Sequence, residues 1–213
     1  MTRYFRDETG MFIDWSQLGK LPEINTLIDI GVGPMGTPEL YKRFPSAKLL
    51  LVDPLEETEN YISKNLLSRK VMFYNCGVGK EEGNAVIHVQ KEIGSSSILE
   101  TADINYESAP IDKRKISIRT LDSITKSEKN LGKLGMKIDT EGYELNIILG
   151  ATETLKSTEF VLAEVRHNHE SFHGVYKLHD FVNTMHDNGF VLTMIITAKP
   201  FIADLCFQQR NNL

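Results

Sequence analysis

The stretch that decides the fold is TLIDIGVGPMGTP, residues Thr26–Pro38. Its first part, Thr26–Gly31, is apolar and predicts a buried strand. The glycines that follow favour a sharp turn close to a ligand, because glycine has no side chain and tolerates positive φ. Thr37 and Pro38 then indicate a helix start, with a hydroxyl cap and a proline in the first turn. This order is typical of α/β proteins that bind a ligand at the carboxyl end of a strand.

Short β-rich segments and helical segments alternate through most of the chain, without an internal repeat. This alternation predicts a mainly parallel, doubly wound sheet with helices on both faces. We expect further strands at Ala47–Val52, Val71–Asn75, Leu134–Asp139 and Glu159–Val165, and helices from Thr37 to Phe44 and at Glu56–Leu67, Tyr143–Leu155 and Val175–Asn188.

Two regions depart from simple alternation. Phe190–Ala198 and Ala203–Gln209 are joined by so short a turn, at Lys199-Pro200, that they should be antiparallel. In the middle, Asn84–Gln90 and Lys115–Thr120 predict a small β-hairpin inserted beside the main sheet. We therefore expect one domain over residues 26–213, with residues 1–25 packing on it as an N-terminal segment.

Composition limits the function classes. The 213 residues carry a net charge of −5 and the sequence pI is about 5.7, which argues against nucleic acid or an anionic membrane as the main partner. The basic run Lys113–Lys115 is interpreted as a solvated loop. Cys76 and Cys206 show no metal-ligand or redox spacing, and Met1–Asp14 lacks the features of a signal peptide. A cytoplasmic protein with reduced thiols is the expectation.

An acidic residue marks the end of the second expected strand. Asp53 lies 22 residues after Gly31, where a carboxylate can accept hydrogen bonds from both hydroxyls of a ribose. The glycine turn also fits the spacing G-x-G-x-x-G, which a nicotinamide cofactor would suit equally well. Together they indicate a ligand that contains adenosine, without identifying it.

A third motif, KIDTEGYEL, follows the strand that should end near Asp139. Its acids Asp139, Glu141 and Glu144 lie at an expected strand-to-helix junction, on the same sheet edge as Asp29 and Asp53. Carboxylates at that edge can hold the cationic end of a ligand or accept a proton. They can also stabilise a helix N-terminus through its dipole, and Glu144 is the acid best suited to that role alone.

This third motif resembles the signature of the FkbM-type methyltransferases, which depend on S-adenosylmethionine. The family pattern runs from an isoleucine-aspartate through glutamate-glycine and glutamate to glycine-alanine, and Asp139, Glu141, Gly142, Glu144 and Gly150-Ala151 fit it. Other segments resemble the family in the same order, namely Leu27–Gly31, Leu51–Pro54, Asn75–Gly79, Ser95–Leu99 and Thr120–Asp122. The cofactor turn departs from it, with Val32-Gly33 in place of alanine-asparagine and Gly36 one residue later than usual.

The resemblance implies a seven-stranded sheet with a reversed final hairpin. It implies methyl transfer to a hydroxyl of a small molecule, often a sugar or a natural-product scaffold. Carried over by position, the cofactor would be held by Asp29, Gly31 and Gly33 at its methionine part, Asp53 at its ribose, Asn75 and Cys76 beside its adenine, and Asp139 from the fourth strand.

An alcohol must lose a proton as it attacks a methyl group, so a base should lie within hydrogen-bond reach. The candidates are Asp139, Glu141, Glu164 and His167. Asp139 and Glu164 could instead share a divalent cation such as magnesium, although no ligand set is complete in sequence. His169 and His173 fit a polar loop better than a site.

Two other functions stay open. A nicotinamide-dependent oxidoreductase would explain the glycine turn and Asp53, but not the final hairpin or the acidic third motif. A module that binds S-adenosylmethionine without catalysis would preserve every motif. The acceptor and the oligomeric state cannot be read from the sequence, because acceptor contacts come from variable loops.

Overall fold

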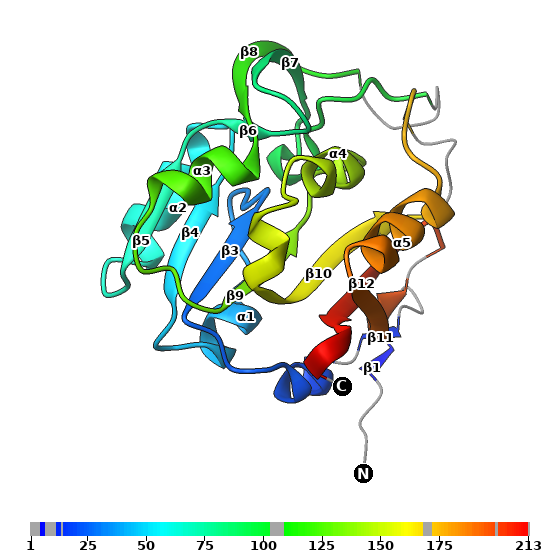
Figure 1. Ribbon diagram of the computed structural model, residues 1–213. Coiled ribbons are helices and arrows are strands. Elements are labelled where there is room, and N and C mark those ends of the chain that lie inside the picture. Colours follow the sequence, from blue (N-terminus) through cyan, green and yellow to red (C-terminus); the bar gives the residue numbers. More distant parts are fainter. Residues whose placement is uncertain are drawn as a thin grey trace.

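A twisted nine-stranded sheet runs through the centre of the molecule (Figure 1). This computed structural model describes residues 5–6, 12–13, 15–102, 109–167, 172–198 and 200–212. The strand order is β1-β2-β11-β12-β10-β9-β3-β4-β5. Seven of these strands, β11 to β5 in that order, form the sheet that the sequence predicts, and β1 and β2 extend it at one end.

Five neighbouring parallel strands form one side of this sheet, with β5 at its edge, and their registers align the site residues. They are β10 (Thr158–Arg166), β9 (Leu134–Ile138), β3 (Thr26–Ile30), β4 (Lys48–Val52) and β5 (Val71–Tyr74). Asp29 on β3 pairs with Lys137 on β9 and with Leu51 on β4. Because these strands are parallel, their carboxyl ends meet at one edge, as the sequence predicts.

The last two long strands are antiparallel to each other, which confirms the predicted hairpin. β11 (Phe190–Ala198) pairs antiparallel with β12 (Ile202–Gln209), and β12 lies antiparallel between β11 and β10. On the far side of β11, the short strand β2 (Phe12–Ile13) pairs with it at Thr197 and Ala198, and β1 (Phe5–Arg6) pairs with β2.

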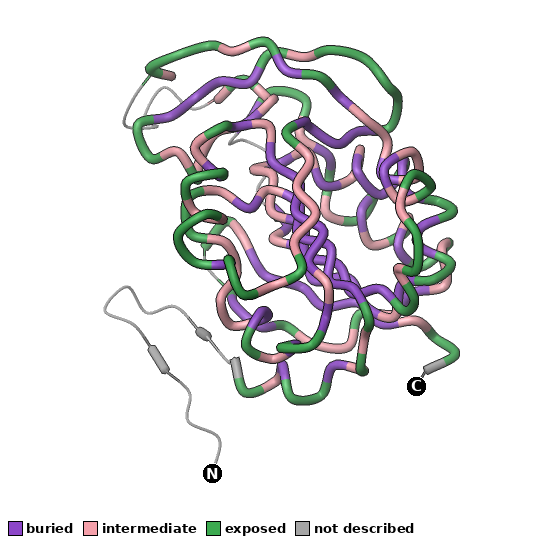
Figure 2. The backbone as a smooth tube through the Cα atoms, turned by 90° about the vertical axis from the view of Figure 1, so that its left-hand side faces the viewer, coloured by how far each residue is buried: buried purple, intermediate pink, exposed green. Residues whose placement is uncertain are grey.

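Helices cover both faces of the sheet, as alternation predicts. On one face α3 (Leu121–Ser127), α4 (Glu144–Leu149) and α5 (Leu178–Asp187) bury their apolar residues against β3, β9 and β10. On the other face η1 (Trp15–Lys20), α1 (Pro38–Arg43) and α2 (Glu57–Asn65) pack on a second cluster. Figure 2 shows the buried residues concentrated in the sheet between these exposed layers.

The inserted β-region is a separate three-stranded sheet above the carboxyl ends of β3 and β4 (Figure 1). β8 (Asp112–Arg119) pairs antiparallel with β7 (Gly83–Val89) and parallel with β6 (Gly77–Val78). The hairpin prediction is confirmed, but the basic run is not a loop. It lies within β8, where Arg114 forms ion pairs with Glu57 and Asp112.

One helix prediction was wrong in extent, and one helix was not predicted. The helix expected at Tyr143–Leu155 ends at Leu149, and a separate 3-10 turn, η3, follows at Thr154–Ser157. Gly150 packs so tightly that a Cβ there would lie 2.1 Å from the main-chain oxygen of Gly79. Helix α3 was not predicted, although Thr120 caps it by accepting a hydrogen bond from the Ser123 N–H.

Two further 3-10 turns complete the fold, η2 at Ile93–Ser95 and η4 at Arg210–Asn212. Among the described residues, no helix combines the length and the apolar character needed to cross a bilayer.

Candidate functional site

The carboxyl ends of β3, β4 and β9 open onto one cavity with about 560 Å³ of empty space, part of it continuous with solvent. Gly31, Asp53 and Asp139 all line it, which confirms that the three sequence motifs converge. The remaining wall is mostly apolar and includes Ile30, Gly33, Val52, Pro54, Leu55, Cys76, Gly77, Val78, Ile87, Ile93, Gly94, Ser96, Ile98, Thr140 and Tyr143. A mainly apolar cavity with a few polar groups is typical of a small-ligand site.

The glycine turn after β3 lies directly against the end of β9. Gly31 has φ of 79° and Gly33 has φ of 59°, in the left-handed region that glycine adopts most easily. A Cβ on Gly31 would lie 1.8 Å from the main-chain oxygen of Asp139, and the Asp139 N–H donates to the Ile30 carbonyl at 2.9 Å. The two motifs therefore hold each other at the cavity wall.

Asp53 joins the glycine turn to the end of β4. Its Oδ2 accepts from the Gly33 N–H at 2.7 Å, and its Oδ1 accepts from the Leu55 N–H at 2.8 Å. The residue is 4% exposed, and burial raises the pKa of its carboxyl above the ordinary value. The carboxylate lies in the wall at the place expected for a ribose contact, which itself remains a prediction.

Asp29 is fully buried and is not among the residues that line the cavity. Its Oδ2 accepts a 2.5 Å hydrogen bond from the Tyr41 hydroxyl on α1, while Oδ1 has no hydrogen-bond partner among the residues that the structure describes. Burial raises the pKa of Asp29 to about 6. Its predicted contact with the methionine part of a cofactor remains a prediction. The structure shows a hydrogen bond that joins α1 to β3, the strand before the glycine turn.

The two residues expected beside an adenine differ in position. Cys76 is buried and lines the cavity, and burial raises the pKa of its thiol to about 11. Asn75 is exposed, is absent from the cavity wall, and donates through Nδ2 to the Asp53 carbonyl at 3.1 Å. Cys76 could therefore contact a ligand directly, whereas Asn75 supports the end of β4.

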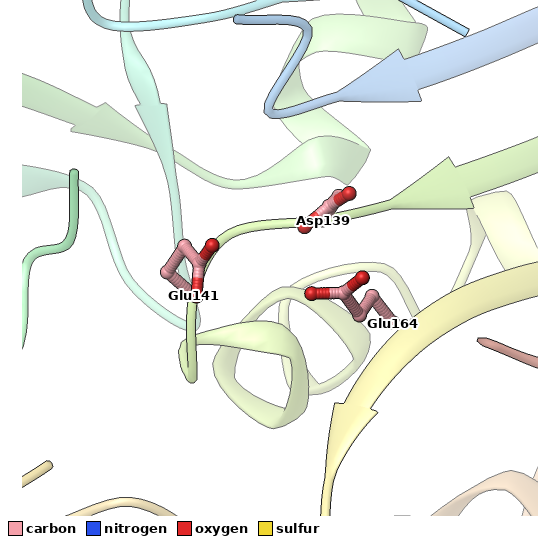
Figure 3. Close-up of side chains that lie close together, drawn as sticks. All are labelled: Asp139, Glu141 and Glu164. Atoms are coloured by element: carbon pink, nitrogen blue, oxygen red, sulfur yellow. The ribbon is translucent and has the colours of Figure 1, made fainter. Parts of the chain in front are cut away.

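Three of the four candidate bases meet in an acidic group at the ends of β9 and β10. Asp139, Glu141 and Glu164 each place a carboxylate oxygen within 4.8 Å of the others. Figure 3 shows the Glu164 side chain directed from β10 toward the loop that carries Asp139 and Glu141. The group is only partly buried, and Asp139 is its member that lines the cavity.

A buried lysine underlies this acidic group. Nζ of Lys137, on β9, lies 3.1 Å from Asp139 Oδ2 and 3.3 Å from Asp204 Oδ1. Burial by itself lowers the pKa of Lys137, but neighbouring carboxylates, Asp139 and Asp204 foremost, raise it above its ordinary value. Lys137 therefore remains charged at neutral pH.

A second buried cation, Arg166 at the end of β10, forms an ion pair with Glu141. Its guanidinium also lies over the Phe172 ring, 4.6 Å from the centroid. Glu141 itself has φ of 55°, which is unusual for a residue with a side chain, and its carbonyl accepts from the Ser97 hydroxyl at 2.8 Å. Contacts at both the side chain and the main chain thus hold Glu141 in a strained conformation.

Glu144 lies in the first turn of α4, as expected, but it does more than complement a helix dipole. It is fully buried, and its Oε1 accepts from the N–H groups of Thr140 and Gly142, each at 3.0 Å. Its Oε2 accepts from the Tyr176 hydroxyl at 2.8 Å, and burial raises the pKa of its carboxyl. Glu144 therefore holds the loop that carries Asp139 and Glu141.

Neither His167 nor His173 lines the cavity. His167 is exposed directly after β10, and its N–H donates to the Phe201 carbonyl at 3.1 Å. His173 is also exposed, and its N–H donates to the Glu100 carbonyl at 2.8 Å. His169 lies outside the described residues.

Sequence reasoning missed four contributors to the site. It assigned no role to Lys137 or Arg166, although Lys137 lies within the quoted motif. It also missed Ile93 and Gly94, which form the upper wall of the cavity around η2 together with Ser96 and Ile98 of the family-like segment Ser95–Leu99. The apolar residues that flank the serines could have indicated this wall, because a fully exposed loop does not require apolar side chains.

Comparisons with known proteins agree with this geometry. The family model described as methyltransferase FkbM domain matches residues 31–192. The fold is similar to methyltransferase FkbM from Methylobacillus flagellatus KT, at 16% identity and a TM-score of 0.54, over 86% of this chain and 43% of that one. It is also similar to a putative S-adenosylmethionine dependent methyltransferase from Listeria monocytogenes, at 10% identity and a TM-score of 0.50, over 92% and 97% of the two chains. No curated protein matches this sequence.

At these identities the likeness to solved structures concerns the fold alone. The chain spans less than half the length of the Methylobacillus flagellatus protein.

Proposed function

Since the chain belongs to the family of FkbM-type methyltransferases, we propose that it is an S-adenosylmethionine-dependent O-methyltransferase that acts on a hydroxyl of a small molecule, such as a sugar or a natural-product scaffold. The observation that carries the proposal is the meeting of Gly31, Asp53 and Asp139 in one cavity. A nicotinamide enzyme would need the first two, but it has no use for the acidic loop beside them.

The residues of the cavity fit S-adenosylmethionine. Gly31 and Gly33 leave the turn free of side chains, Asp53 offers a carboxylate to ribose hydroxyls, and Cys76 borders an apolar wall suited to a purine. Asp139 supplies a partly exposed carboxylate for the amino group of the methionine part. The cofactor supplies an electrophilic methyl group on a sulfonium, and the protein must align an acceptor oxygen with it.

The proton of the acceptor hydroxyl would pass to a carboxylate of the acidic group. We assign the role of base to Glu164, because it is partly buried and directs its carboxylate from β10 toward Asp139 and Glu141 (Figure 3). A general base typically contributes a factor of about 10² to 10⁴ in rate. Glu164→Gln should therefore reduce turnover by about that factor while S-adenosylhomocysteine affinity stays within about threefold.

A divalent cation bound to Asp139, Glu141 and Glu164 is the alternative use of the same group. Direct proton transfer is favoured, because two buried cations already offset part of the negative charge. Turnover measured in EDTA, and again with added magnesium, separates the two. Loss of turnover in EDTA with recovery by magnesium would favour the cation.

The experiment that tests the function is calorimetric titration with S-adenosylhomocysteine and, separately, with NAD. Saturable binding of the first but not the second is expected, with a corresponding rise in melting temperature. Binding of NAD alone would favour an oxidoreductase. Binding of S-adenosylmethionine with no methyl transfer to any of a panel of sugars, phenols and hydroxylated scaffolds would favour a non-catalytic module.

A further inference from the structure

The side chain of Lys137 extends from the buried strand β9 to the proposed site. Its side chain leaves β9 on the same face as Asp29 and Asp204, and only 5% of it is exposed. The ammonium has three N–H donors, and three acceptors lie near it, namely Asp139 Oδ2 at 3.1 Å, Asp204 Oδ1 at 3.3 Å and the Ile138 carbonyl at 3.5 Å. The amine is thus fixed before any ligand arrives.

Its two carboxylate partners differ in what surrounds them. Asp204 is buried on β12, where its Oδ2 accepts a 2.5 Å hydrogen bond from the Thr197 hydroxyl and its N–H donates to that same hydroxyl. The Asp139 side chain is 34% exposed and lines the cavity. Asp204 therefore anchors the lysine within the protein, whereas Asp139 is the partner that a ligand can reach.

We propose that Lys137 is a positioning residue that holds the Asp139 carboxylate toward the methionine end of S-adenosylmethionine. This inference rests on the proposed function. The main chain of Asp139 is already fixed against Gly31 and Ile30. The side chain still has two rotatable bonds, and the lysine restrains them. Lys137 also lies between Asp139 and Asp204, whose carboxylates would otherwise repel each other across the intervening strand β10.

A double-mutant cycle on S-adenosylhomocysteine affinity tests this role. If Lys137 acts through Asp139, then Lys137→Met, Asp139→Asn and the double variant should all weaken binding by a similar factor, about 30-fold. Lys137→Arg should recover affinity to within about fivefold, because a guanidinium can still bridge the two carboxylates. Lys133→Met is the matched control, since that lysine is exposed at the start of β9 and should leave affinity unchanged.

A buried lysine replaced by methionine can also impair folding, so a charge-balanced variant accompanies the cycle. Lys137→Gln with Asp204→Asn removes one charge of each sign and should show the same loss of about 30-fold. Wild-type affinity in Lys137→Met, or single effects that multiply to about 1,000-fold in the double variant, would overturn the inference. Failure of the wild-type protein itself to bind S-adenosylhomocysteine would instead overturn the proposed function.

Discussion

The main-chain oxygen of Asp139 occupies the space that a side chain on Gly31 would need, with only 1.8 Å between that oxygen and a Cβ built on the glycine. Two motifs more than a hundred residues apart in sequence are therefore in direct backbone contact. The contact fixes the glycine turn against the acidic loop, and both segments line the cavity.

Gly31→Ala should destabilise the protein strongly, by about 3 kcal/mol or more, because neither backbone can move freely and φ at residue 31 is positive. Thermal or denaturant unfolding measures the loss. Gly83→Ala is the control, since nothing lies within 4 Å of a Cβ there. Its stability should change by less than about 1 kcal/mol. A Gly31→Ala protein as stable as the wild type would contradict the described packing.

Asp53→Ala should weaken S-adenosylhomocysteine binding by about 10- to 100-fold, because the variant loses the carboxylate assigned to the ribose. Some loss of stability should accompany it, since Asp53 also accepts from the N–H groups of Gly33 and Leu55. Calorimetry on the folded variant separates the two effects, with Glu59→Ala on the exposed side of α2 as control. Unchanged affinity in Asp53→Ala would refute the placement of the ribose.

The sequence predicts the central strands well because their signals are local. Continuous apolar runs such as Leu49–Val52 identify buried parallel strands, and parallel strands must bring their carboxyl ends together. The convergence of Gly31, Asp53 and Asp139 could therefore be predicted without coordinates. The start of α3 could also have been predicted from the sequence, because Thr120 is a residue type that favours the N-cap of a helix.

Other features depend on contacts that no local pattern encodes. Gly150 ends α4 because it packs against Gly79, which is distant in sequence. Lys137 pairs with Asp204 on β12, two strands away in the sheet, and Arg166 pairs with Glu141 in the loop after β9, so neither pair can be predicted from spacing in the sequence. The hydrogen bond that Asp29 accepts from the Tyr41 hydroxyl could not be predicted either, because Tyr41 belongs to a helix packed on the sheet, and a ligand contact of Asp29 stays a prediction.

Asp29→Asn should change the pH dependence of stability. The pKa of this carboxyl rises from its ordinary value of 3.8 to about 6 on folding, because burial disfavours the charged form. Between those pH values the folded state binds more protons than the unfolded state, so the free energy of unfolding falls as pH rises through that window and then levels off. The asparagine stays neutral and avoids this loss, which amounts to about 3 kcal/mol.

The stability of Asp29→Asn relative to wild type should therefore be about 2–3 kcal/mol more favourable at pH 8 than at pH 4. Urea unfolding at both pH values measures this difference, with Glu81→Gln at an exposed position as control. A stability difference that does not vary with pH would show that Asp29 keeps its ordinary ionisation in the folded protein.

The ion pair between the buried Arg166 and the partly buried Glu141 should show strong coupling in the free energy of unfolding. Replacing one partner leaves the other charge buried without its counter-ion, so Glu141→Gln and Arg166→Met should each cost about 3 kcal/mol. The double variant should be more stable than either single variant, because no unpaired charge remains and methionine can still pack on Phe172. Denaturant unfolding of the four proteins gives the coupling energy, and additive single effects would mean that the pair does not act as a unit.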